Sequence, residues 1–174
     1  MYPSTAAWWS QYNESKAIVA YQKEVKADPP PGNAVELERA HAYNDKLSTG
    51  EIVVGTDSNK PVLLGEKDDD SGYWDLLPGE NGIMGRLKIP SIDVDLPIYH
   101  GTSDEVLEHG VGHLQGTSLP VGGENTHAVL TAHTGLAKAT LFNDLNKVKL
   151  GDTFSISVNG EVVTYKTIEV QTIL

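Results

Sequence analysis

Residues 83–98, IMGRLKIPSIDVDLPI, decide the fold, because they contain two short apolar runs on either side of Pro90-Ser91. In the second run, apolar residues alternate with Asp93, Asp95 and Pro97, which is the pattern of a strand with one face in the core. We therefore expect strands over residues 83–89 and 92–98. The same alternation places Asp93 and Asp95 on one solvated face, where they do not by themselves indicate a glycosidase-type carboxylate pair.

The chain after this stretch also has the character of a β protein. It shows no regular alternation of strands with long helices, and Asn159-Gly160 is the strongest short-range signal for a hairpin. A closed barrel or a sandwich is therefore favoured. The predicted elements are a short helix that begins at a capping box in residues 102–105 and runs to His109 before Gly110, a strand at 127–132, one or two helical turns at 140–148, and hairpin strands at 153–158 and 161–170.

The chain before this stretch divides into two parts. Residues 1–49 form a helical prefix with predicted helices at 6–26 and 34–47, separated by the proline-rich break at 28–32. Residues 50–82 form an irregular acidic segment, which is either a solvated connector or a lid that docks through Tyr73 and Trp74. Residues 83–174 make up the β part.

Composition excludes several classes of function. The 174 residues carry a net charge of −11 and no basic cluster, so nucleic acid and anionic membrane surfaces are not expected as partners. No apolar run is long enough to span a membrane, and the N-terminus does not resemble a signal peptide. The absence of Cys excludes disulfides, thiolate zinc sites and a cysteine nucleophile within these residues. No cofactor is expected.

Histidines are the remaining candidates for chemistry. His109 and His113 have the spacing of a helical metal pair, but the glycines between them break the helix that this spacing needs, so no metal site is expected. His133 lies where the strand at 127–132 should end, between small residues that leave room for a substrate. A loop histidine is also often an ordinary polar surface residue, and spacing alone does not decide between the two interpretations.

Five blocks of sequence follow one another in the second part of the chain: IPSIDVDLPIY at 89–99, HGVGHL at 109–114, GTSLPVGG at 116–123, LTAHTGL at 130–136 and LFNDL at 141–145. In their order, spacing and residues, these blocks resemble the class C sortases, the pilin-polymerising cysteine transpeptidases of Gram-positive bacteria. The N-terminal residues 40–44, AHAYN, resemble that family's helical prefix.

This resemblance implies a mainly β fold with N-terminal helices, a sortase-type β-barrel, and a catalytic histidine, cysteine and arginine. His133 matches the family's histidine. The family cleaves Leu-Pro-x-Thr-Gly-like sorting signals between Thr and Gly through a thioacyl-enzyme, and a pilin lysine then forms an isopeptide bond. Pilin subunits would be the partners. The location would be the extracellular face of the Gram-positive cell membrane, reached through a membrane anchor that these residues do not contain.

The chain departs from the family pattern in two ways. The chain contains no Cys, and no Arg follows Arg86, so neither the nucleophile nor the catalytic arginine can be assigned. We therefore expect the chain to be inactive alone. No Asp-Pro-aromatic lid tripeptide occurs between Asn44 and Glu80. We expect a barrel that is incomplete at the C-terminus, with open strand edges that can support homo-oligomers. The alternative function is a non-catalytic surface or scaffold domain that binds pilin through its groove or an open edge.

Overall fold

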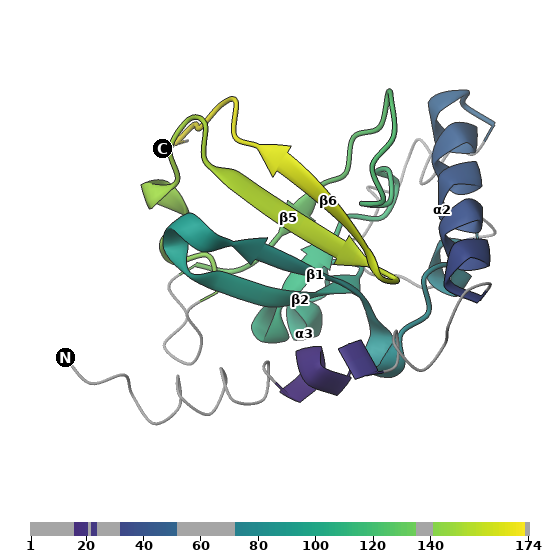
Figure 1. The fold of residues 1–174 in the computed structure, drawn as a ribbon, viewed down its shortest axis with the longest axis horizontal. Coiled ribbons are helices and arrows are strands. Elements are labelled where there is room, and N and C mark those ends of the chain that lie inside the picture. The colour runs from purple at the N-terminus through teal and green to yellow at the C-terminus, as the bar shows by residue number, and fades with distance from the viewer. Residues whose placement is uncertain (1–15, 21, 24–31, 52–71, 135–140, 173–174) are drawn as a thin grey trace.

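Six strands form one curled sheet in the computed structural model, which describes residues 16–20, 22–23, 32–51, 72–134 and 141–172 (Figure 1). The strand order is β4-β3-β2-β1-β5-β6, so β4 and β6 are the two end strands. The curled sheet with its few helices confirms the predicted incomplete barrel. The strands are β1 (Ile83–Ile89), β2 (Val94–His100), β3 (Val111–His113), β4 (Leu130–Thr131), β5 (Thr153–Val158) and β6 (Glu161–Lys166).

Helices surround this sheet. Residues 16–20 and 22–23 are helical, and the rest of the helix predicted at 6–26 lies outside the described residues. The second predicted helix is confirmed as α2. The elements are α2 (Gly32–Ser48), α3 (Asp104–His109), and the 3-10 turns η1 (Tyr73–Asp75), η2 (Glu80–Gly82), η3 (Pro90–Ile92) and η4 (Leu145–Lys147).

The turn between β1 and β2 corrects one prediction. Residues 90–92 form η3 and Asp93 has a φ of 55°, so β2 begins at Val94 rather than at Ile92. Asp93 belongs to the turn and shares no strand face with Asp95. The Asp95 carboxylate instead forms a two-pronged ion pair with the Arg86 guanidinium across β1 and β2.

The β5–β6 hairpin confirms the turn prediction. Asn159 and Gly160 have φ values of 46° and 86°, the two positive values that a two-residue type I′ turn requires. Six consecutive pairs join the strands, from Val158 with Glu161 to Thr153 with Lys166. The second strand ends at Lys166 rather than at residue 170.

A short crossover through α3 places β3 parallel to β2, an arrangement that the sequence did not predict. Helix α3 ends at Gly110 as expected, but its N-cap is Ser103, whose Oγ accepts a hydrogen bond from the Val106 amide at 3.3 Å. The predicted capping box, which needs Thr102 as the cap, is therefore wrong by one residue. Gly112 is required in β3, because a Cβ at this position would lie 2.5 Å from the Gly101 carbonyl oxygen.

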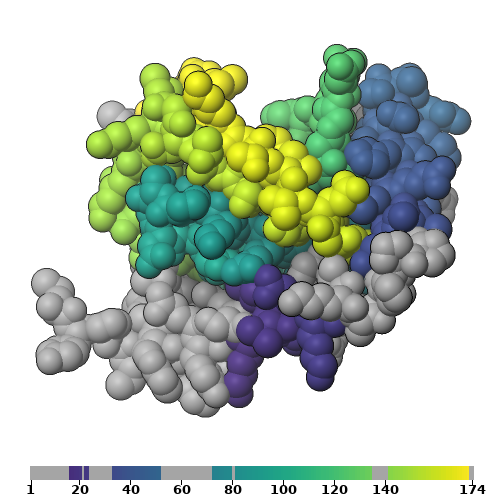
Figure 2. All heavy atoms as spheres, viewed as in Figure 1, coloured from purple at the N-terminus to yellow at the C-terminus, as the bar shows by residue number. Residues whose placement is uncertain are grey.

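A buried side-chain amide joins helix α2 to the loop that precedes β4. Asn44 is 2% exposed, its Nδ2 donates to the Leu119 carbonyl at 3.0 Å, and its Oδ1 accepts from the Leu119 amide at 2.7 Å. The side chain thereby pairs with Leu119 as a neighbouring strand would. Figure 2 shows the blue α2 directly against the green loop that contains Leu119. This contact joins the helical prefix to the loop that leads into β4.

The core combines side chains of α2, of the strands and of the loops between them, and includes Tyr43, Met84, Ile98, Leu119 and Phe142. Residues 52–71, which hold most of the predicted acidic connector or lid, lie outside the described residues, and the proposed division at residues 49 and 82 stays a prediction. Within the described ranges, no helix combines the length and the apolar character needed to cross a membrane.

Candidate active site

Strand β4 carries the candidate catalytic histidine to the end of the sheet. Its two residues pair with β3 through Gly112 with Thr131 and His113 with Leu130. Residues 127–129 were expected to belong to the same strand. They are irregular instead, but they are held by bonds from the Leu114 amide to the Val129 carbonyl and from the Ser118 amide to the His127 carbonyl, both 2.9 Å.

His133 follows β4 by two residues and is half-buried. Its carbonyl oxygen accepts a hydrogen bond from the Phe142 amide at 3.2 Å, which brings the chain back to β4 after residues 135–140. Among the residues that the structure describes, no side-chain hydrogen bond of His133 is found.

A groove of about 550 Å³ is lined in part by Leu130 of β4 and by Phe142. His133 is not among the lining residues, but Leu130, three residues before it, and Phe142, whose amide binds its carbonyl, both are. The walls are mainly apolar, with Glu169 as the charged group. The other lining residues are Leu87, Ile89, Leu145, Asn146, Val148, Phe154, Thr167, Val170, Gln171 and Thr172.

Such a groove suits an extended segment with apolar side chains. Residues 167–172 on one wall are not assigned to a strand, and β4, which bears Leu130 on the other wall, is an end strand of the sheet. An incoming segment could meet free backbone groups along an end strand as well as apolar side chains in the groove.

A second set of aromatic and histidine side chains is gathered at β3, the strand that pairs with β4. This aromatic cluster consists of Tyr73, Trp74, His100 and His113. His113, on β3, is fully buried, and its ring stacks on Tyr73 with centroids 5.6 Å apart. The Tyr73 hydroxyl lies 2.9 Å from His113 Nδ1, and His113 Nε2 lies 2.8 Å from the Ser118 carbonyl oxygen.

These contacts set the state of the His113 ring. Because a carbonyl oxygen can only accept, Nε2 carries the proton that it donates to Ser118, and Nδ1 accepts from the Tyr73 hydroxyl. Burial lowers the pKa of His113 to about 4, the Ser118 carbonyl opposes that change, and the nearby His100 adds to it. His113 is therefore a neutral structural residue at pH 7.

The aromatic cluster holds the segment that leads into β1. His100 Nε2 donates to the Leu76 carbonyl at 2.8 Å, and Tyr73, Leu76 and Leu77 are almost completely buried. The prediction that this part of the acidic segment docks through its aromatic residues is therefore confirmed for Tyr73. The lid interpretation concerns residues 52–71 as well, and it stays a prediction.

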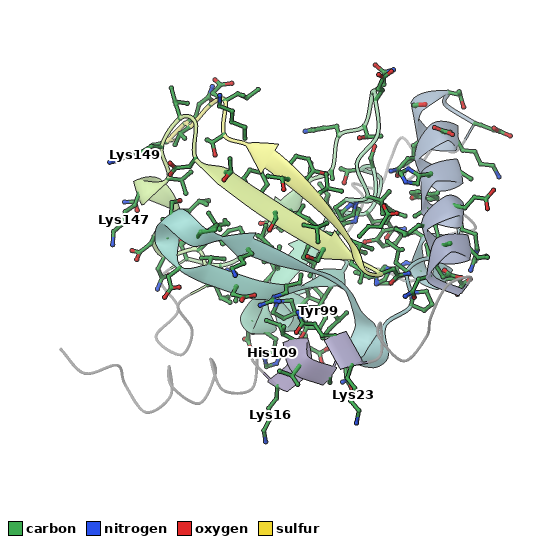
Figure 3. All side chains as sticks on the ribbon, viewed as in Figure 1. Lys16, Lys23, Tyr99, His109, Lys147 and Lys149 are labelled. Carbon is green, nitrogen blue, oxygen red and sulfur yellow. The ribbon has the colours of Figure 1, made fainter. Side chains whose placement is uncertain are left out.

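The structure separates the two histidines that had metal-ligand spacing. His109 is exposed at the end of α3 and is labelled below the sheet in Figure 3, whereas His113 is buried with both ring nitrogens engaged. Across the described ranges, no cluster of three or more His, Cys, Asp or Glu residues could hold a metal ion. Sequence reasoning missed the roles of His113 and Asn44, whose partners are 40 and 75 residues away in the chain.

Comparison with known proteins identifies the family. A family model described as the sortase domain matches residues 87–174, which is 88 of the 174 residues. The chain belongs to the sortase family. Sortase D of Bacillus subtilis is similar to it, with 32% identity over 92 residues that make up 53% of this chain and 43% of the relative.

Solved structures of class C sortases resemble this sortase chain over most of its length. Sortase C1 of Streptococcus agalactiae is 39% identical with a TM-score of 0.72, and the match covers 84% of this chain and 72% of that protein. Sortase C-1 of Actinomyces oris is 44% identical with a TM-score of 0.66, and the match covers 79% and 74%. The chain spans less than half the length of the curated sequence relatives that it matches.

Proposed function

We propose that this chain is the histidine-bearing part of a sortase-type cysteine transpeptidase of class C. The observation that carries the proposal is the position of His133, which follows an end strand of the curled sheet and is bonded through its carbonyl to Phe142, a residue that lines a mainly apolar groove. A half-buried imidazole in this position can exchange protons with a peptide bound next to it. The family match and the class C structures support the same assignment.

The proposed reaction is acyl transfer. A thiolate attacks the carbonyl carbon between Thr and Gly of a Leu-Pro-x-Thr-Gly-like signal, the C–N bond breaks, and the His133 imidazolium donates its proton to the leaving amine. A pilin lysine amine then attacks the thioester, the thiolate leaves, and His133 accepts the proton of the amine. The thiol and the oxyanion-stabilising guanidinium must come from polypeptide outside these 174 residues, which hold no Cys and no Arg after Arg86. The proposed location is the Gram-positive cell surface.

A mixing experiment tests this proposal. The chain is combined with a peptide that carries the Cys-bearing and Arg-bearing strands of a class C sortase, and cleavage of a fluorogenic Leu-Pro-x-Thr-Gly peptide is followed. We expect cleavage by the mixture and by neither part alone. His133→Ala should abolish it, whereas His127→Ala, at an exposed histidine before β4, should retain it. Failure of the mixture to cleave while an intact class C sortase cleaves would contradict the proposal.

A second candidate function is pilin binding without catalysis. The observation that favours it is the groove itself, which offers apolar walls in a chain that contains no thiol. Fluorescence anisotropy of a labelled sorting-signal peptide distinguishes the two functions. Binding by the chain alone, weakened by Val148→Glu in the groove wall and followed by no cleavage in the mixture, would favour the binding function.

A further inference from the structure

Phe142 touches the groove and the candidate catalytic residue at the same time. Its side chain is 8% exposed and lines the groove, while its amide donates to the His133 carbonyl at 3.2 Å. No other residue of the described chain has both contacts. A change in the position of Phe142 must therefore displace the backbone that carries the His133 imidazole.

Phe142 is itself held firmly on its other side. Its carbonyl accepts from the Leu145 amide at 3.0 Å, and the Leu145 carbonyl accepts from the Val148 amide at 3.2 Å, so a series of tight turns begins at Phe142. The preceding residue, Leu141, is 2% exposed and packs in the core. The segment after residue 140 is thus a rigid support, fixed by packing and by its own backbone bonds.

His133 has few other restraints. It follows a strand of only two residues, and the described part of the chain gives its side chain no hydrogen-bond partner. Within the part of the chain that the structure describes, the bond from the Phe142 amide is the polar contact found for the backbone of His133.

We propose that Phe142 is a positioning residue that couples occupation of the groove to the placement of His133. The inference rests on the proposed function, because it concerns the histidine assigned to proton transfer. A ligand side chain that packs on Phe142 stabilises the rigid support and, through the 3.2 Å bond, the orientation of His133. By thermodynamic linkage, correct placement of His133 raises the affinity of the groove for the ligand by the same factor by which the ligand favours that placement.

The test compares two matched substitutions in the same groove, Phe142→Leu and Phe154→Leu. Phe154, on β5, lines the groove and stacks on Tyr165 with centroids 5.3 Å apart, but it makes no bond to His133. The imidazole signal of His133 is followed by nuclear magnetic resonance during a pH titration and is assigned by its loss in His133→Gln. Amide hydrogen exchange at residue 142 is measured in parallel, and circular dichroism checks that each variant is folded.

Phe142→Leu should speed exchange at residue 142 by about tenfold or more and shift the titration curve of His133, whereas Phe154→Leu should change neither. Addition of a Leu-Pro-Ala-Thr-Gly peptide should move the His133 signal in the unmodified chain and move it less in Phe142→Leu. Phe142→Met, which keeps more of the side-chain volume, provides the same comparison if Phe142→Leu does not fold.

Two results would overturn the inference. One is an unchanged His133 titration in folded Phe142→Leu or Phe142→Met, and the other is an equal change in Phe154→Leu. The resonance measurements need no catalytic turnover. A failed mixing experiment together with a shifted His133 titration would therefore reject the proposed reaction and leave the positioning role of Phe142 standing.

Discussion

The buried imidazole of His113 makes a quantitative prediction about acid sensitivity. The ring packs against Tyr73 from η1 and lies near His100 from β2, and its two nitrogens are occupied by the Tyr73 hydroxyl and the Ser118 carbonyl. Protonation of Nδ1 would place a charge in this apolar surrounding and break the bond that Tyr73 donates. The folded protein therefore resists protonation of His113, with a pKa of about 4.

The sign of the effect follows from proton uptake. Above pH 6.5 the ring is neutral in both the folded and the unfolded chain, so His113 adds no pH dependence there. Between pH 6.5 and about 4, the unfolded chain binds a proton that the folded chain does not, and the free energy of unfolding falls as the pH falls. The full loss is about 3 kcal/mol, and most of it should appear between pH 7.5 and pH 4.5.

Urea unfolding at pH 7.5 and pH 4.5 measures this loss, with tryptophan fluorescence as the signal because Trp74 belongs to the aromatic cluster. His113→Gln should be less stable at pH 7.5 but should lose about 2–3 kcal/mol less than the unmodified chain on acidification. The control is His127→Gln, which removes an exposed histidine and should leave the acid-induced loss unchanged. If His113→Gln and the unmodified chain lost the same free energy on acidification, the assignment of a neutral, buried His113 would be refuted.

Three further substitutions test the packing that supports the site. Asn44→Ala leaves the amide of the buried Leu119 without its partner, while the Leu119 carbonyl keeps the bond from the Val121 amide at 2.8 Å, and should lower the free energy of unfolding by about 1–3 kcal/mol. Gly112→Ala forces a Cβ to within 2.5 Å of a backbone carbonyl oxygen and should cost more than about 2 kcal/mol. Arg86→Met removes the partly exposed pair with Asp95 and should cost less than about 1 kcal/mol. Urea unfolding midpoints measure all three.

Each of these substitutions has its own comparison. Asn146→Ala, at an exposed amide, should be nearly neutral, and an equal loss in both asparagine variants would contradict the role of Asn44. A Cβ added at Gly72 would meet no atom within 4 Å, and the φ of 73° is the remaining penalty. Gly72→Ala should therefore lower the free energy of unfolding by about 1 kcal/mol. The small effect of Arg86→Met should shrink further in 1 M NaCl; a cost that is large and independent of salt would contradict the weak ion pair.

Local patterns in the sequence were sufficient for several elements because their causes are local. The Asn159-Gly160 turn needs two positive φ values, which these residue types supply, and it defines the register of β5 with β6. Gly110 also ends α3 as predicted, but its φ of 178° is extended, and a Cβ there would lie 2.8 Å from the Pro97 carbonyl oxygen, so β2 and not the local turn requires this glycine. Where two local options compete, the prediction failed by a residue or two, as at Ser103 and at Asp93.

The sequence by itself determined the β character of residues 83–174, the helix α2, the absence of a thiol, and His133 as the candidate site residue. Tertiary structure alone decided that His113 is buried and neutral, that Asn44 pairs with Leu119, and that Phe142 joins His133 to the groove. The physical reason is distance along the chain. Burial and hydrogen bonding of a side chain depend on residues that only folding brings near it, and no periodicity in one segment records which distant carbonyl or ring it will meet.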